Sequence, residues 1–220
     1  MSDKEHIFNF TNPEDFNEKT SPILKDAWTQ VQKSADFFAQ VIKANGPNTF
    51  SSTVVVFNCD KELSAVVTSR PVFGKEDLYQ SLCEILFLPV TIRSQLFIVV
   101  TDTVMRDPEK PNSKQDAINM TFVSPDYCMI YTLPYSIQPE NEVVFNYDES
   151  NIISVFKEDE ATAAAAGDML ELFYVFSHVE NTGPFHIDDV LAYFDDNDMI
   201  YEIINKENLQ KRPASFLNQG

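Results

Sequence analysis

One aspartate and two arginines are the polar residues of this sequence best placed to do chemistry. Asp102 interrupts an apolar stretch at residues 96–105. Because alternate side chains of a strand share a face, its carboxylate would point to the same face as the apolar residues two and four positions away. Arg106 has the same parity, and Arg70 ends a second predicted strand. A carboxylate on an apolar face requires a partner. We therefore expect Asp102 to form a structural ion pair with Arg70 or Arg106 or, alternatively, to act as a catalytic or ligand-fixing acid.

No established catalytic or phosphate-binding motif accompanies these residues. The sequence contains no GxSxG, HExxH, HxH or CxxC, and its 5 glycines form no glycine-rich phosphate loop. Cys59, Cys83 and Cys128 are an odd set without metal-ligand spacing, so we interpret all three as reduced thiols. Cys83 and Cys128 lie in apolar patterns and are expected to be small buried residues. We assign no catalytic residue and no cofactor.

Two weaker metal patterns do not have the required spacing. His178 and His186 are separated by a Gly-Pro turn, whereas helix-borne ligands stand three or four residues apart. The run at 195–198 resembles the start of a calcium loop. However, Ile200 occupies the sixth position, where an EF-hand needs glycine, and Lys206 occupies the twelfth, where it needs glutamate. We predict no metal site and interpret 195–198 as an exposed polar turn.

The charge is the most informative property with respect to partners. The formal net charge is -18; residues 1–110 carry 15 acids and 11 bases, and residues 111–220 carry 19 acids and 5 bases. Nucleic acids and anionic lipid surfaces are bound through Lys and Arg, so this balance disfavours direct binding to either. Solubility is the simplest explanation of the acidity. The functional explanations are a basic partner protein, or imitation of a nucleic acid in a partner's basic groove.

A helix-turn-helix outline at 187–206 meets the same objection. Between residues 185 and 210 there are seven acids, and Lys206 is the only Lys or Arg. A recognition helix of this composition would enter a DNA groove against strong repulsion. Helix packing or docking to a partner is the expected role of this segment.

Changes of hydrophobic period along the chain predict the scaffold for these residues. Residues 1–20 are expected to form an irregular arm, and a three-to-four residue apolar stripe predicts a long helix within 21–46 that packs on the core. The predicted core, 47–150, contains strands at 53–57, 63–68, 96–105, 117–123, 128–133 and 143–147, a helix at 75–88 stopped by Pro89, and an exposed polar loop at 106–116.

The rest of the chain is predicted to be helical. An acidic helical region at 151–210 would contain helices near 163–177, 187–194 and 199–206, followed by a tail at 211–220. The predicted fold class is α+β: a mainly antiparallel sheet of five or six strands with a covering helix, preceded by a long N-terminal helix and followed by C-terminal helices. The sequence has no apolar stretch of bilayer length and no signal-peptide pattern, so we expect a cytoplasmic protein without a membrane span.

We expect a non-enzymatic accessory or regulatory interaction module that uses the acidic C-terminal helical face and the 106–116 loop to bind a partner protein. One alternative is a small-molecule-binding protein or enzyme with a site near Asp102. A second alternative is an acidic inhibitor that imitates nucleic acid. In its frequent Asn, Asp, Phe and Ile residues and its few glycines the chain resembles hypothetical proteins of marine microbes and their phages, and this resemblance gives no residue a role.

Overall fold

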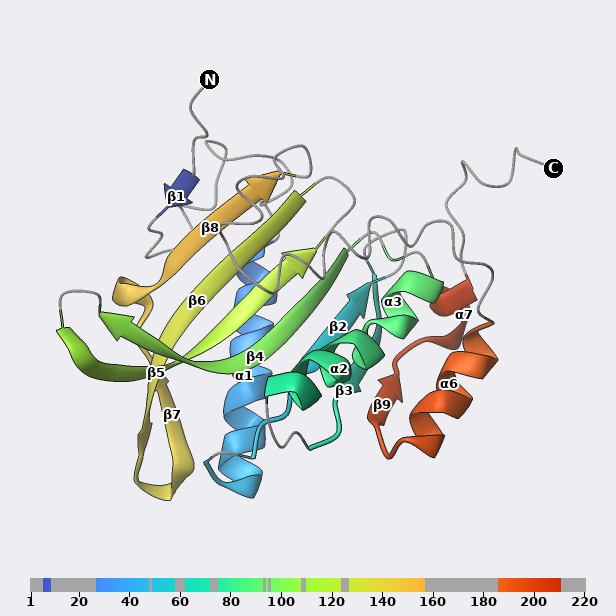
Figure 1. Ribbon diagram of the computed structural model, residues 1–220, viewed down its shortest axis with the longest axis horizontal. Coiled ribbons are helices and arrows are strands. Elements are labelled where there is room, and N and C mark those ends of the chain that lie inside the picture. The colour runs from blue at the N-terminus through green and yellow to red at the C-terminus, as the bar shows by residue number, and fades with distance from the viewer. Residues whose placement is uncertain are drawn as a thin grey trace.

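The computed structural model shows an α+β fold in which helices cover both faces of one curled antiparallel sheet (Figure 1). It describes residues 6–8, 27–47, 49–57, 62–71, 75–92, 94, 96–107, 110–123, 127–156 and 186–210. The helices are α1 (Ala27–Asn45), α2 (Lys75–Ile85), α3 (Phe87–Thr91), α6 (Ile187–Asp196) and α7 (Lys206–Gln210), with short 3-10 turns η3 (Pro139–Asn141) and η4 (Tyr147–Glu149).

The described residues contribute nine strands to the sheet: β1 (His6–Phe8), β2 (Thr53–Phe57), β3 (Leu63–Thr68), β4 (Leu96–Asp107), β5 (Lys110–Val123), β6 (Tyr127–Gln138), β7 (Glu142–Phe145), β8 (Asn151–Phe156) and β9 (Ile200–Ile203). Their order is β1-β8-β6-β5-β4-β2-β3-β9, and β7 pairs with the far end of β6. Strands β2 to β8 form the central part of the sheet, and β1 and β9 are its two edge strands. The predicted α+β class and antiparallel sheet are confirmed, whereas five or six strands was too few.

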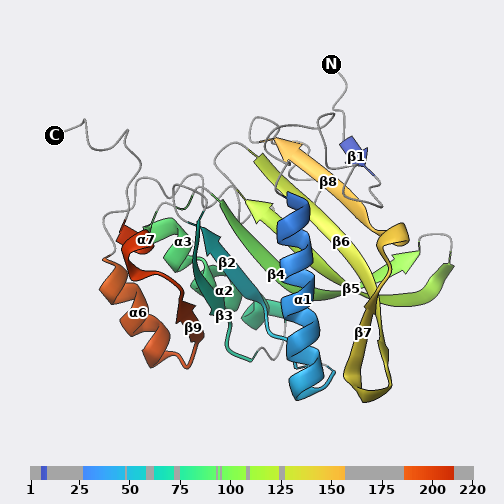
Figure 2. The same ribbon diagram turned by 180° about the vertical axis from the view of Figure 1, so that it is seen from behind.

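Helix α1 covers one face of the sheet (Figure 2). Its buried apolar residues recur every three or four positions and so lie on one side of the helix: Val31, Ala35, Phe38 and Ile42. They pack against inward-facing residues of the sheet, which are Phe57, Ile98, Val100, Ile118, Met120, Phe122, Tyr131, Leu133 and Tyr135. The helix ends where Gly46, at φ +94, donates its N–H to the Ile42 carbonyl over 2.8 Å. The predicted N-terminal helix is thus confirmed over residues 27–45.

Helices α2, α3 and α6 cover the opposite face (Figure 1). A second core cluster joins them to the sheet; its members include Val54, Val56, Ala65, Val67, Leu82, Ile85, Leu86, Leu88, Val190 and Phe194. Because the central strands bury side chains on both faces, their sequences are continuously apolar rather than alternating. None of the described helices is long and apolar enough to cross a membrane.

The predicted helix at 75–88 is two helices. Helix α2 ends at Ile85 and α3 begins at Phe87, so Pro89 lies inside the first turn of α3 instead of stopping the preceding helix. Proline is tolerated there because the first N–H groups of a helix have no intrahelical acceptor. Pro89 is buried within α3 and does not end the helical segment.

The C-terminal region contains strands that the sequence did not reveal. The helix near 187–194 is present as α6, but residues 199–206, predicted as a helix, form β9 followed by the start of α7. Residues 151–156, placed in the helical region, form β8 between β1 and β6. The predicted irregular arm at 1–20 contributes β1. The predicted helix at 163–177 and the tail at 211–220 lie outside the described residues.

The predicted loop at 106–116 is largely a β-ribbon. Strand β4 continues to Asp107 and β5 starts at Lys110, with Val104 opposite Asp116 and Asp107 opposite Lys110. Neighbouring strands pair with β4 only as far as Val100 and with β5 only from Ala117, so the ribbon extends beyond the rest of the sheet (Figure 1). Backbone pairing does not require apolar side chains, which is why so polar a sequence forms strands here.

Candidate functional site

The structure places two of the three residues that the sequence suggested as a polar site, and these two make different contacts. Asp102 accepts a hydrogen bond from the Tyr135 hydroxyl, at 2.9 Å from Oδ1. Arg70 pairs instead with Glu84, with 3.4 Å between Nε and Oε2. The backbone of Arg106 lies in β4, and its side chain is outside the described part of the structure. Asp102 and Arg70 therefore each contact a different residue, and the alternative pairing of Asp102 with Arg106 falls outside the described side chains.

Asp102 lies on the face that the strand period predicted. Tyr135, its hydrogen-bond donor, belongs to the core cluster that also holds Ile98 and Val100. Burial raises the pKa of the Asp102 carboxyl and the nearby Asp116 raises it further, whereas the hydrogen bonds from Tyr135 and from the Thr103 backbone oppose the rise. Among the described side chains, the charged group that acts on Asp102 is thus another acid.

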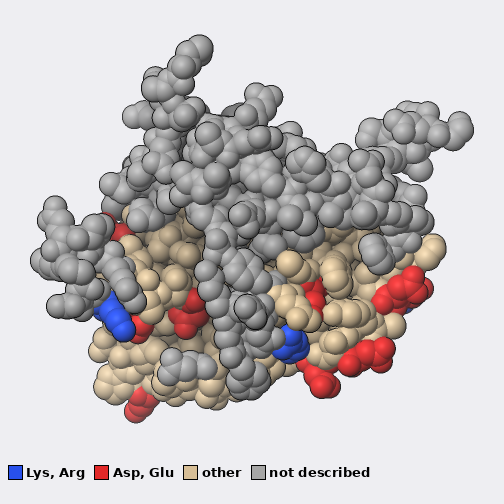
Figure 3. Space-filling model, viewed as in Figure 1, with Lys and Arg blue, Asp and Glu red and all other residues tan. Residues whose placement is uncertain are grey.

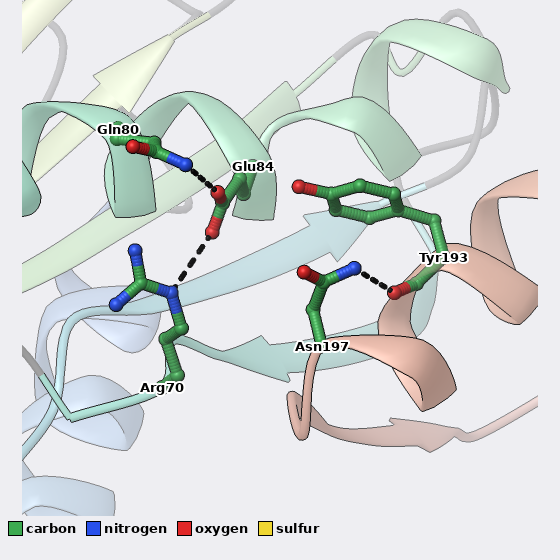
Figure 4. A network of polar contacts seen from close by, with 5 residues as sticks. All are labelled: Arg70, Gln80, Glu84, Tyr193 and Asn197. Atoms are coloured by element: carbon green, nitrogen blue, oxygen red, sulfur yellow. Dashed lines mark hydrogen bonds and ion pairs between the residues drawn. The ribbon is translucent and has the colours of Figure 1, made fainter.

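A buried glutamate that sequence reasoning missed forms a second polar centre (Figure 4). Glu84 lies in the last turn of α2, and its side chain is 4% exposed. Gln80, one turn earlier on α2, donates Nε2 to Glu84 Oε1 over 2.8 Å. Arg70, just past the end of β3, supplies the compensating charge. One acid within the apolar part of the predicted helix, between Cys83 and Ile85, was the available signal, although it did not identify Arg70 as the partner.

Tyr193 connects this centre to α6. Its hydroxyl points toward Glu84 in Figure 4. Burial, the charge of Glu84 and a hydrogen bond to it raise the pKa of Tyr193, and the positive charge of Arg70 acts in the opposite direction. At the end of the helix, Asn197 Nδ2 donates to the Tyr193 carbonyl over 2.8 Å. The centre therefore links the end of β3 to α2 and α6 through polar contacts, and this geometry indicates a structural role.

Acidic side chains surround the last strand. Among the described residues 186–210, Figure 3 shows Asp and Glu gathered over α6 at the lower right. The exposed acids of this segment are Asp188, Asp189, Asp195, Asp196, Asp198, Glu202 and Glu207. On β9, Ile200 is 73% exposed and Ile204, just after the strand, is 47% exposed. We call Ile200, Glu202 and Ile204 the β9 outer face, because alternation places these three side chains on one side of the strand.

Strand β9 is held to α6 from its other face. Tyr201 and Ile203, which alternate with the outer-face residues, are partly buried against the core cluster of α2, α3 and α6. The Tyr201 hydroxyl donates to Asp195 Oδ1 over 3.0 Å. Burial raises the pKa of Tyr201, and this hydrogen bond together with the Asp195 charge raises it further. The outer face is therefore presented by a strand that is fixed on its inner side.

Other candidate sites have weaker support. A shallow groove of about 240 Å³ between α1 and residues 141–143 includes neither Asp102 nor Arg70. Within the described ranges, no group of three or more His, Cys, Asp or Glu residues could hold a metal ion. Cys83 is a half-buried free thiol whose pKa is raised by burial and by Glu84. The side chains of Cys59, Cys128 and His178 are outside the described residues.

Comparison of this chain with protein-family models, with curated proteins and with solved structures finds no significant match.

Proposed function

We propose that this protein is a non-enzymatic interaction module that binds a basic partner protein through the β9 outer face and the acids around it. The observation that carries the proposal is the exposure of Ile200 and Ile204 on a strand whose neighbouring charges are almost all negative. Isolated exposed apolar residues are common on protein surfaces. Two on one strand face, with Glu202 between them, are instead arranged as a small apolar centre with a charged rim.

The charges favour a basic partner. The segment 186–210 contains seven acids and a single Lys or Arg, Lys206, so an approaching cationic surface is attracted over the whole segment. Complementary charge of this kind increases association rates and selects against acidic partners. The mimicry of nucleic acid is a special case, in which the partner's basic surface is one that normally holds a phosphate backbone.

A second candidate function is a small-molecule site at Asp102. The observation that favours it is the hydrogen bond between Tyr135 and Asp102 on the α1 face of the sheet. A ligand bound there would raise the melting temperature of the protein, and high salt would not remove this increase. Asp102→Asn would abolish it. Screening by thermal shift with a metabolite panel in high and low salt tests this candidate.

The test of the main proposal uses the full chain and a fluorescein-labelled lysine octamer. Binding is measured by anisotropy at about 20 mM and about 200 mM salt, because screening weakens contacts between exposed charges. We expect the variant Asp196→Asn/Glu202→Gln to bind several-fold more weakly than wild type at low salt. The matched control, Asp148→Asn/Glu149→Gln, removes two exposed acids from η4 and should leave the affinity within about twofold.

Equal weakening in the two variants would show that the octamer responds to net charge alone and would overturn the proposal. If the C-terminal variant alone binds more weakly, the site is assigned to this segment. Competition by a DNA duplex for a basic partner, once one is known, separates the mimicry alternative from ordinary docking.

A further inference from the structure

We infer that the open edge of β9 receives an extended basic segment of the partner as an additional antiparallel strand. This inference rests on the proposed function and specifies how the partner is held. The segment would carry apolar residues two positions either side of a Lys or Arg, so that the apolar pair covers Ile200 and Ile204 and the cation meets Glu202.

One edge of the β9 backbone is not paired with any described strand. Strand β9 is the last in the sheet order, so its second edge pairs with no strand in the part of the chain that the structure describes. Its pairing with β3 places Glu202 opposite Val66 and Ile200 opposite Thr68. One residue further along, the Ile204 N–H donates to the Ser64 carbonyl over 2.9 Å.

The direction of each backbone group follows from this pairing. In an antiparallel ladder, hydrogen-bonded and non-hydrogen-bonded pairs alternate along the strand. Since Ile204 bonds to β3, the N–H and C=O groups of Glu202 and Ile200 also point to β3. Those of Tyr201 and Ile203 therefore point to the open edge, where they offer two donors and two acceptors to an incoming strand.

The side chains match the same register. On the open edge, Ile200, Glu202 and Ile204 occupy the non-hydrogen-bonded positions, where facing side chains of an antiparallel pair approach most closely. Apolar residues of the incoming strand would thus cover the exposed side chains of Ile200 and Ile204. Main-chain bonds supply affinity in this mode of recognition, and the alternating side chains supply specificity.

A second copy of this chain fits the edge poorly. If two β9 strands paired about a two-fold axis at residue 202, Glu202 would face Glu202, and like charges directly opposite each other are destabilising. The formal net charge of -18 on each copy adds repulsion. A basic strand from another protein has neither disadvantage, and it neutralises Glu202.

The experiment uses the full chain and a labelled peptide, acetyl-Lys-Val-Thr-Lys-Thr-Val-Thr-Lys-amide. In the inferred register its central Lys faces Glu202, its two Val residues face Ile200 and Ile204, and the two Thr residues between them direct their N–H groups at β9. Methylating those two Thr nitrogens removes donors without changing charge. Methylating the nitrogen of the central Lys, which points away from β9, is the matched control. We expect at least a tenfold loss of affinity for the first peptide and less than about threefold for the second.

A protein variant tests the same register. Ile200→Ser removes apolar cover from the β9 outer face and should weaken the peptide at least fivefold. The control Val144→Ser changes a residue that is 48% exposed on β7 and should have no effect. Equal affinity of the two methylated peptides would overturn the strand-addition mode, as would a β9-dependent homodimer in solution.

This failure is distinguishable from failure of the proposed function. If the lysine octamer still responds to Asp196→Asn/Glu202→Gln while the methylated peptides bind alike, the acidic surface binds cations without adding a strand. If the octamer does not distinguish the C-terminal variant from the η4 control, the proposed function itself is wrong.

Discussion

Arg70, just past the end of β3, and Glu84, in the last turn of α2, form an ion pair with 3.4 Å between Nε and Oε2, and the Glu84 side chain is 4% exposed. Arg70 is the charge partner of Glu84 Oε2, and Gln80 donates a hydrogen bond to the other carboxylate oxygen. Because the Tyr193 hydroxyl is directed at the same carboxylate, the pair also contacts α6, the helix that precedes β9.

Removing one member of this pair should destabilise the fold strongly. Arg70→Met leaves a buried carboxylate without a cation, and such a change typically costs about 3 to 5 kcal/mol of unfolding free energy. The double variant Arg70→Met/Glu84→Leu removes both charges and should recover most of that loss. Urea unfolding of the four proteins in a double-mutant cycle measures the coupling.

Lys33→Met is the control for this cycle, since Lys33 is exposed on α1 and its loss changes the net charge equally. It should shift stability by no more than about 0.5 kcal/mol. A double variant as unstable as Arg70→Met alone would contradict the idea that an uncompensated charge is the cause.

Removing either of the two neighbours of Asp102, Tyr135 or Asp116, should shift the pKa of Asp102, and the two shifts should be opposite in direction. The folded-state pKa of Asp102 lies above the ordinary aspartate value, first because of burial. Tyr135→Phe removes a hydrogen bond to the carboxylate and should raise the pKa further, whereas Asp116→Asn removes a negative charge and should lower it. Carbon-13 NMR of the Asp102 carboxyl over a pH series measures both shifts; shifts of the same sign would refute this description.

The same raised pKa has a consequence for stability. A carboxyl whose pKa is higher in the folded than in the unfolded protein favours folding below the unfolded pKa, and this contribution is lost as pH rises through the folded pKa. Asp102→Asn does not titrate, and its amide oxygen still accepts from Tyr135. Its stability relative to wild type should therefore improve as pH rises from below the ordinary aspartate pKa of about 3.9 through the raised folded-state pKa, as measured by urea midpoints at each pH.

Truncating the centre of the α1 interface should be among the most damaging apolar changes. Phe38 is fully buried, with ring centroids 4.8 Å from Phe50 and 5.0 Å from Tyr135. Phe38→Ala should lower the unfolding free energy by about 3 to 5 kcal/mol, through lost burial and the cavity left behind. Gln40→Ala, on the exposed side of the same helix, should change it by less than about 0.5 kcal/mol. Comparable losses in the two variants would mean that α1 does not pack as described.

The β4–β5 ribbon can be tested by cross-linking. Val104 and Asp116 are opposite each other, at a separation that a disulfide spans in an antiparallel pair. Val104→Cys/Asp116→Cys should therefore oxidise readily to the linked form, identified by mass spectrometry of a digest. Val104→Cys/Lys114→Cys is displaced by two residues and should link far less. Similar yields in the two variants would indicate an irregular loop, as the sequence suggested.

The helix α1 and the strands β2, β3 and β4 could be predicted because each has a local hydrophobic pattern that identifies the type of element. A three-to-four residue apolar stripe sustained through Val31, Ala35, Phe38 and Ile42 is consistent only with a helix that has one buried side. The apolar run at 96–100 likewise indicated a strand covered on both faces. The parity of Asp102 was also readable, which is why its carboxylate was expected on the α1 face where Tyr135 meets it.

Tertiary structure decided the elements whose local signal is short or polar. Residues 200–203 carry too few positions to separate a period of two from one of 3.6, and β9 exists because β3, far earlier in the chain, offers an edge to pair with. The polar ribbon at 106–116 is a strand pair because β4 and β5, consecutive in the chain, pair through their backbones, which requires no apolar side chains. The partners of Arg70 and Asp102 were not readable either, because an ion pair or hydrogen bond depends on which side chains the fold brings within about 3 Å. The hydrophobic period of the sequence indicates which face of an element a residue occupies. Only the packing of the elements determines which side chain from elsewhere in the chain lies against that face.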